Sequence, residues 1–231
     1  MEAVLRGQDT LVVLPTGFGK SLVYQVPALL VERPTVVISP LIALMIDQER
    51  SLRRRTVPVV RIDSTLRAAE RREALERVAQ GGRLVVLTTP ETLLSESAGP
   101  VFAQARPSLL CVDEAHCITE WGHDFRPAYL RLGPVRERLG NPPVLALTAT
   151  ATPHVQEDIL ARLRLLNPTV ITAPPYRDNL LLGVRIVPGN LKLDAVARLL
   201  RSLRRPGIIY CATTVAVDQI WSALTRARIP A

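Results

Sequence analysis

Short apolar runs, many of them rich in β-branched residues, recur along the chain and are bounded by turn-forming residues. Six of them lie at residues 11–14, 35–39, 57–62, 84–88, 108–112 and 143–148. A short, continuously apolar run is typical of a strand that is buried on both faces of a parallel sheet. The hydrophobic pattern therefore predicts six buried strands in the first two thirds of the chain.

Longer segments with a helical pattern alternate with these runs. The one at residues 22–30 is apolar, and those at residues 41–54 and 66–80 are amphipathic. Thr152 followed by Pro153 indicates a helix start, because threonine caps a first turn and proline fits its first position. We therefore expect a helix over residues 154–166 and a last strand over residues 167–173. Strands that alternate with helices predict an α/β fold, a doubly wound parallel sheet with helices on both faces. The active site of such a fold lies at the carboxyl ends of the strands.

The remainder of the chain predicts a linker and a second unit. Residues 173–189 contain prolines and glycines, which favours an interdomain connection. The residues after it show a helical pattern, an apolar run and another helical pattern, at 191–205, 207–213 and 215–227. We interpret residues 1–172 as a first domain and residues 190–231 as the truncated beginning of a second α/β domain, because about forty residues do not normally bury a core.

The net charge of +8 is carried almost entirely by arginine, since Lys20 and Lys192 are the only lysines. Residues 50–77 contribute +5, from nine arginines and four acids, and residues 177–231 contribute +6, from eight arginines, one lysine and three acids. Guanidinium groups bind phosphate in a bidentate manner, so a polyanionic partner is one explanation. Solvated helix faces are the other, and charge alone does not separate the two.

Two features of the composition exclude other classes of protein. The cysteines Cys111, Cys117 and Cys211 form no CxxC pair, which argues against a disulfide framework and against a cysteine zinc site. No apolar run approaches the roughly 18 residues of a membrane span, and the first residues lack the pattern of a signal peptide. We therefore expect an intracellular, cytoplasmic protein with no membrane partner.

The segment PTGFGKS, residues 15–21, lies between the first predicted strand and an apolar helix. Glycines there allow backbone N–H groups to surround phosphate oxygens, while a lysine reaches the terminal phosphates and a serine hydroxyl binds magnesium. Gly17, Gly19, Lys20 and Ser21 fit this pattern, although the strict eight-residue form has glycine where Leu14 stands. The alternative is a glycine turn that only caps a helix.

Two acids follow the predicted strand at 108–112. At the carboxyl end of that strand, Asp113 suits a magnesium ligand and Glu114 suits the group that orients or deprotonates the attacking water. Taken alone, an Asp-Glu pair after a strand is more often a helix start. The Thr-Ala-Thr turn at 148–150 ends another strand, and its hydroxyls are placed to bond the acidic motif or His116.

Several motifs occur together in an order that resembles the RecQ family of superfamily 2 DNA helicases. They are PTGFGKSLVYQVPAL, SPLIALMIDQ, TTPETLL, DEAHCITEWGHDFRP, LALTATAT, YRDNL and GIIYCATT. The fourth is the most specific, because RNA helicases of the DEAD and DEAH groups lack its aromatic continuation. The resemblance covers essentially the whole chain and implies a RecA-like first domain followed by the start of a second RecA-like domain.

The resemblance also implies roles for individual residues. The nucleotide would be held by Thr16, Gly17, Gly19, Lys20 and Ser21, and magnesium by Ser21 and Asp113. The catalytic residues would be Lys20, Asp113, Glu114 and His116, and single-stranded DNA would contact Trp121, Phe125 and Arg126. Aromatic rings stack on bases of any sequence, which suits such a loop. The alternative places Trp121, Phe125 and Tyr129 as a core stripe on one helix, but Gly122 and Pro127 interrupt that helix.

The implied function is an ATP- and magnesium-dependent DNA helicase that moves 3′ to 5′ and acts on single-stranded and partly duplex DNA. Relatives carry an adenine-reading element upstream of the phosphate loop, and Gln8 lies too near the first strand to fill that role. They also carry an arginine finger in the completed second domain, so we expect this chain alone to hydrolyse ATP poorly. A non-hydrolysing nucleotide- or DNA-binding module and an RNA helicase remain as alternatives.

Overall fold

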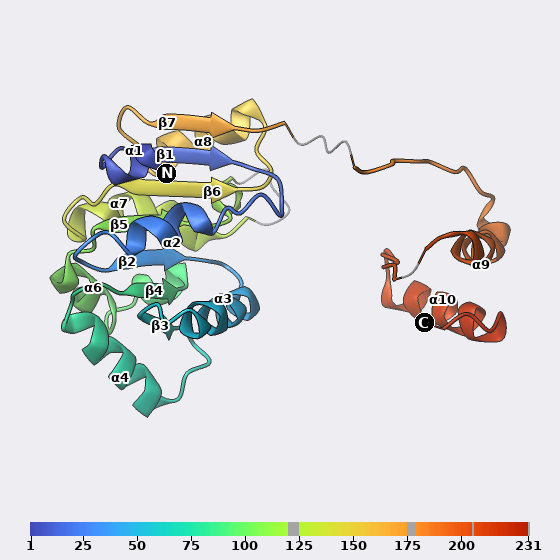
Figure 1. Cartoon of the computed structure of the whole chain (residues 1–231), viewed down its shortest axis with the longest axis horizontal. Helices are drawn as coiled ribbons and strands as arrows, with labels where there is room; N and C mark the ends of the chain where they lie inside the picture. Colours follow the sequence, from blue (N-terminus) through green and yellow to red (C-terminus); the bar gives the residue numbers. More distant parts are fainter. Residues whose placement is uncertain (120–124, 175–178, 205, 231) are drawn as a thin grey trace. The chain divides into compact units, whose positions relative to one another are not determined.

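The computed structural model describes residues 1–119, 125–174, 179–204 and 206–230. The chain divides into two compact units, Met1–Tyr176 and Arg177–Ala231 (Figure 1). None of the helices in the described ranges is long and apolar enough to cross a membrane.

Unit 1 is built on a seven-stranded sheet in which every pairing is parallel. The strand order is β3-β4-β2-β5-β6-β1-β7. The strands are β1 (Thr10–Val13), β2 (Thr35–Ile38), β3 (Val59–Ile62), β4 (Val85–Thr88), β5 (Leu109–Val112), β6 (Val144–Thr148) and β7 (Thr169–Thr172). All seven strands predicted within residues 1–173 are therefore present, and the α/β, doubly wound fold class is confirmed.

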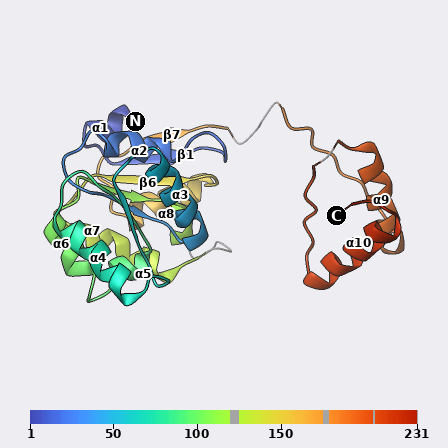
Figure 2. The ribbon, with the colours of Figure 1, turned by 60° about the horizontal axis from the view of Figure 1, so that its bottom comes forward.

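Alternate strand residues point into two separate cores, as the two-residue period of a strand requires. Leu11 and Val13 of β1 join one core, and Val12 joins the other. The Val12 core is covered by α1 (Glu2–Leu5), α2 (Leu22–Ala28) and α3 (Ile42–Arg54) (Figure 2). The Leu11 core is covered by α4 (Ala68–Ala79), α5 (Pro90–Leu93), α6 (Gly99–Ala105), η1 (Ala115–Ile118), η2 (Pro127–Arg131), α7 (Leu132–Arg138) and α8 (Pro153–Arg162).

A buried ion pair ties elements together at the amino ends of the strands. Asp9, which precedes β1, accepts two hydrogen bonds of 2.8 Å from the guanidinium of Arg136 on α7. Its carboxylate also accepts from the backbone N–H of Val144 at 2.8 Å and of Leu166 at 2.7 Å. This edge is thus occupied by a satisfied structural network, which leaves the carboxyl ends of the strands for a site.

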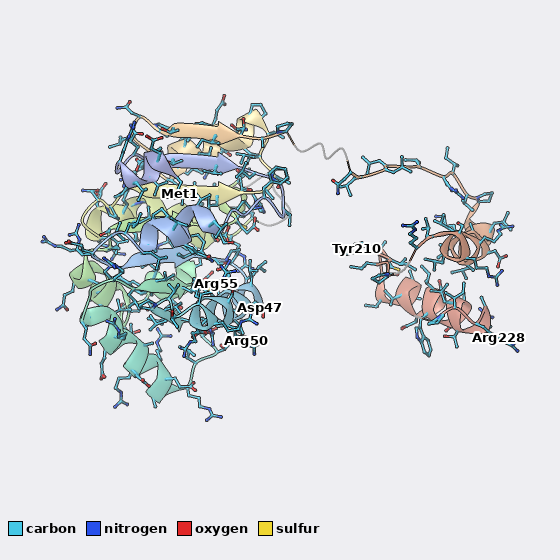
Figure 3. All side chains as sticks on the ribbon, viewed as in Figure 1. Met1, Asp47, Arg50, Arg55, Tyr210 and Arg228 are labelled. Carbon is cyan, nitrogen blue, oxygen red and sulfur yellow. The ribbon has the colours of Figure 1, made fainter. Side chains whose placement is uncertain are left out.

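Unit 2 contains η3 (Gly189–Leu191), α9 (Lys192–Ser202) and α10 (Thr214–Arg226), so both helices predicted there are present. The strand predicted at 207–213 is absent, and that prediction is wrong. The described part of unit 2 contains no strand with which residues 207–213 could pair. A segment without a neighbouring strand cannot form the ladder of hydrogen bonds that defines a strand. The side chain of Tyr210 in this segment is 90% exposed (Figure 3).

Candidate nucleotide site and adjoining loop

The loop between β1 and α2 has the backbone geometry of a phosphate cradle. Gly17 and Gly19 have φ angles of +89° and +78°, a region that residues with a Cβ rarely enter. Among the described residues, the backbone N–H groups of Thr16, Gly17, Gly19, Lys20 and Ser21 donate to no protein acceptor. The Ser21 hydroxyl does not cap α2. The loop therefore has several hydrogen-bond donors that no acceptor in the described ranges satisfies.

Lys20 lies at the same sheet edge as the acid pair. Its ammonium donates a 3.1 Å hydrogen bond to the carbonyl oxygen of Leu14, at the start of the loop. The ammonium is also close enough to Asp113 to lower the pKa of that carboxyl. The strand order explains the proximity, because only β6 separates β1, which carries the loop, from β5, which carries Asp113.

Asp113 is a buried carboxyl directly after β5, with 6% of its surface exposed. Burial, and next the negative charge of Glu114, raise its pKa to about 6. The backbone N–H of Glu114 and the ammonium of Lys20 oppose that rise. The positive charge near Asp113 therefore does not offset the cost of ionising a buried carboxyl. A cation bound beside Asp113 would supply that missing charge.

Glu114, His116 and Thr148 form a contiguous group. The Nδ1 atom of His116 lies 3.3 Å from a carboxylate oxygen of Glu114 and 2.9 Å from the hydroxyl oxygen of Thr148. That hydroxyl in turn donates to the carbonyl of Thr150 at 3.1 Å. Nδ1 and the Thr148 hydroxyl are thus hydrogen-bonded, and the tautomer of His116 decides which of them donates. The expectation that the Thr-Ala-Thr turn bonds His116 is confirmed.

The end of the predicted DNA loop adjoins this group. Phe125 and Arg126 line a cavity of about 440 Å³ together with Pro40, Leu41, Glu114, His116 and Cys117. Trp121, the third residue predicted to contact DNA, lies outside the described residues. Phe125 belongs to no helix, whereas Tyr129 is fully buried in η2, so the alternative of one helical core stripe does not hold for these two residues.

Two features of the site have no sequence signal that we could identify. Glu114 adopts a left-handed backbone conformation, with φ 47° and ψ 46°. The hydroxyl of Tyr129 donates a 3.0 Å hydrogen bond to the backbone carbonyl of Asp113. On α3, Asp47 is exposed and lies 3.7 Å from Arg50 (Figure 3). The side-chain oxygen of Gln48 accepts a 3.0 Å hydrogen bond from the hydroxyl of the buried Tyr24.

Comparison with known sequences assigns the chain to a protein family. Residues 1–159 match the profile of the DEAD/DEAH box helicases. The chain belongs to the DEAD/DEAH box helicase family. Within that family, this helicase chain is 44% identical over 94% of its length to the mouse ATP-dependent DNA helicase Q5. It is 41% identical over 94% of its length to the ATP-dependent DNA helicase RecQ of Synechocystis. The resemblance to RecQ-type helicases is thereby confirmed.

Solved structures resemble this DEAD/DEAH box helicase chain at the level of fold. The Hef helicase domain of Pyrococcus furiosus matches 87% of the chain with a TM-score of 0.58 and 23% identity, and the match covers 44% of that domain. The helicase MrfA, bound to DNA and AMPPNP, matches 98% of the chain with a TM-score of 0.70 and 18% identity, over 34% of MrfA. The chain spans 24% of the mouse relative and 48% of the Synechocystis relative.

Proposed function

We propose that this chain is the ATP-binding motor portion of a RecQ-type DNA helicase. One observation carries the proposal. The phosphate loop and the acid pair occupy one sheet edge, and Glu114 shares a cavity wall with Phe125 and Arg126 of the predicted DNA loop. Nucleotide chemistry and contact with DNA would thus take place within a few side chains of each other.

The triphosphate would bind in the loop from Thr16 to Ser21. Its unused backbone N–H groups and the two positive-φ glycines, Gly17 and Gly19, provide the donors that phosphate oxygens accept. Lys20 would exchange its hydrogen bond to the Leu14 carbonyl for one to a phosphate oxygen. A charge-assisted hydrogen bond of that kind is stronger than the neutral bond it replaces.

The proposed magnesium ligands are the Ser21 hydroxyl and the Asp113 carboxylate. Both are oxygen donors, which magnesium prefers, and the buried Asp113 has a raised pKa that a nearby cation would lower. The described residues contain no cluster of three or more His, Cys, Asp or Glu side chains. Magnesium that is shared with phosphates and water needs no such cluster. When bound, the cation would neutralise charge on the triphosphate.

Glu114 is the proposed group that orients and deprotonates the attacking water. Its carboxylate is partly exposed beside the cavity, so water can reach it. The Nδ1 atom of His116 would lie between that carboxylate and the Thr148 hydroxyl at the end of β6, because it contacts both. In this proposal a shift at the end of β5, which precedes Glu114, or at the end of β6, which carries Thr148, changes the position of the Glu114 carboxylate.

Single-stranded DNA, and partly duplex DNA bearing a single-stranded tail, are the proposed substrates. Phe125 and Trp121 would stack on bases, each stack contributing about 1–3 kcal/mol, and Arg126 would bind a backbone phosphate. By its resemblance to RecQ helicases, the protein would move 3′ to 5′. The excess of arginine, which gives the net charge of +8, is consistent with a polyanionic partner.

The test is ATP turnover and nucleotide binding by the whole 231-residue chain, without nucleic acid, with oligodeoxythymidylate and with an RNA of the same length. We expect magnesium-dependent ATP binding and a slow turnover that DNA stimulates more than RNA. In the Trp121→Ala variant, basal turnover should persist and its stimulation by DNA should be lost. Partial duplexes with a 3′ or a 5′ tail then report the direction of movement.

Other outcomes separate the alternatives. Binding of ATP without turnover, in the presence or absence of DNA, identifies a non-hydrolysing nucleotide-binding module. Stronger stimulation by RNA identifies an RNA helicase. Equal loss of basal and stimulated turnover in Trp121→Ala contradicts the role of that residue in sensing DNA.

A further inference from the structure

The peptide group between Asp113 and Glu114 is held at both of its polar ends. Its N–H, which belongs to Glu114, donates a 3.0 Å hydrogen bond to the Asp113 carboxylate. Its carbonyl, which belongs to Asp113, accepts a 3.0 Å hydrogen bond from the hydroxyl of Tyr129. A rotation of this peptide would therefore break two hydrogen bonds at once.

The orientation of this peptide decides where Glu114 points. Glu114 has φ 47° and ψ 46°, a left-handed conformation that costs a residue with a Cβ roughly 1–2 kcal/mol. Relief of that strain would require the peptide before Glu114 to turn, and its carboxylate would then move away from His116, which it contacts at 3.3 Å. Such a conformation persists only where its surroundings hold it.

Tyr129 is well suited to hold the peptide. Its ring is fully buried in the core beneath β5, so the hydroxyl has a fixed position. A tyrosine phenol is protonated at neutral pH, and a carbonyl oxygen can only accept, so the hydroxyl is the donor in this bond. A phenylalanine at this position would fill the same space without that donor.

The segment that carries Tyr129 is continuous with the predicted DNA loop. The N–H of Tyr129 donates to the carbonyl of Arg126 at 2.9 Å, and the N–H of Arg126 donates to the carbonyl of Cys117 at 2.9 Å. Arg126 and Phe125 line the cavity that Glu114 also lines. Two hydrogen bonds, from the Arg126 N–H to Cys117 and from the Tyr129 hydroxyl to Asp113, thus join the end of the loop to the acid segment.

We propose that Tyr129 is a positioning residue for Glu114. Its hydroxyl fixes the Asp113–Glu114 peptide in the orientation that gives Glu114 its left-handed backbone and directs its carboxylate. The same residue links this geometry to the loop at Phe125 and Arg126. The catalytic part of this inference depends on the proposed role of Glu114. The structural part, that the hydroxyl holds the peptide, does not.

The test uses Tyr129→Phe with Tyr24→Phe as a matched control. Both variants remove one hydroxyl from a fully buried tyrosine. Tyr24 belongs to the opposite core, and its hydroxyl bonds the Gln48 side chain and not the Asp113–Glu114 peptide. Amide hydrogen exchange over residues 113–118, thermal unfolding, ATP affinity and ATP turnover are measured on the whole chain. Exchange is repeated with oligodeoxythymidylate.

In Tyr129→Phe we expect exchange over residues 113–118 to accelerate by about threefold to tenfold, the change that the loss of one hydrogen bond produces. ATP turnover should fall by a similar factor with ATP affinity unchanged, and the oligonucleotide should no longer alter exchange in this segment. Tyr24→Phe should leave exchange over residues 113–118, ATP turnover and ATP affinity at their wild-type values.

Exchange over residues 113–118 that is the same in Tyr129→Phe and Tyr24→Phe would overturn the inference. Faster exchange with unchanged turnover would overturn the positioning role, although it would still show that the hydroxyl holds the peptide. A wild-type chain that neither binds nor hydrolyses ATP would contradict the proposed function instead, and the exchange measurement, which needs no nucleotide, would still decide whether Tyr129 holds the peptide.

Discussion

Replacement of Asp113 by asparagine should stabilise the ligand-free protein while it removes a proposed magnesium ligand. The Asp113 carboxyl is buried, and burial together with the charge of Glu114 raises its pKa to about 6. At neutral pH the fold must therefore hold a charge that its surroundings disfavour. Asparagine carries no charge, and its side-chain oxygen can still accept the hydrogen bond from the Glu114 N–H.

The size of the effect follows from the pKa shift. A rise from 3.8 to about 6 corresponds to about 3 kcal/mol of free energy, at 1.36 kcal/mol per pKa unit. The folded state binds this proton more tightly than the unfolded state, so stability falls as the pH rises from about 3.8 to about 6 and then stays at the lower value. The gain in Asp113→Asn should be about 3 kcal/mol at pH 7.5 and about half of that at pH 5.

Urea unfolding of the whole chain, without magnesium or nucleotide, measures this gain at the two pH values. Asp47→Asn is the control, because Asp47 is an exposed acid 3.7 Å from Arg50, and its replacement should change stability by less than about 0.5 kcal/mol. The reasoning is refuted if Asp113→Asn is no more stable than wild type at pH 7.5, or if its gain is larger at pH 5 than at pH 7.5.

Three further changes test other parts of the structure. Asp9→Ala leaves the buried Arg136 guanidinium and two backbone N–H groups without their acceptor, so urea unfolding should show a loss of about 3–5 kcal/mol; a loss below 1 kcal/mol would contradict the network. Thr148→Val removes the hydroxyl beside His116, so ATP turnover should fall about tenfold with ATP affinity nearly unchanged, and a change in affinity alone would argue against a role in orienting the base. Arg126→Ala should weaken oligodeoxythymidylate binding, and the slope of log affinity against log salt concentration should become less steep by the contribution of about one phosphate contact. An unchanged slope would contradict a contact between Arg126 and DNA.

The strands of unit 1 could be predicted because the physical signal for a buried parallel strand is local. Runs such as Val36–Val37 and Val85–Val86 are apolar on both faces since both faces of the sheet are covered. The short helices on the Leu11 core were not predicted. Gly99–Ala105 and Leu132–Arg138 contain glycine and proline in their first turns, and packing against the sheet stabilises them where local preference does not.

In the candidate site, too, some features could be predicted from the sequence and others could not. The identity of its side chains and their common sheet edge follow from motif spacing and from the rule that parallel strands end together. The bond from Tyr129 to the Asp113 carbonyl could not be predicted, because it joins a side chain to a backbone atom sixteen positions away and neither residue type requires it. The apolar run at 207–213 was predicted as a strand by composition, whereas strand formation depends on a neighbouring strand.

The central claim is that the loop around Lys20 binds the triphosphate of ATP, and the chain offers a direct test because Lys20 and Lys192 are its only lysines. The measurement is the affinity of magnesium ATP for the wild-type chain, for Lys20→Ala and for Lys192→Ala, in which the lysine is lost from α9 of unit 2. Loss of a charge-assisted hydrogen bond to phosphate predicts an affinity about ten- to a hundredfold lower in Lys20→Ala and unchanged in Lys192→Ala. Equal affinities of wild type and Lys20→Ala, or no binding by the wild-type chain, would contradict the account.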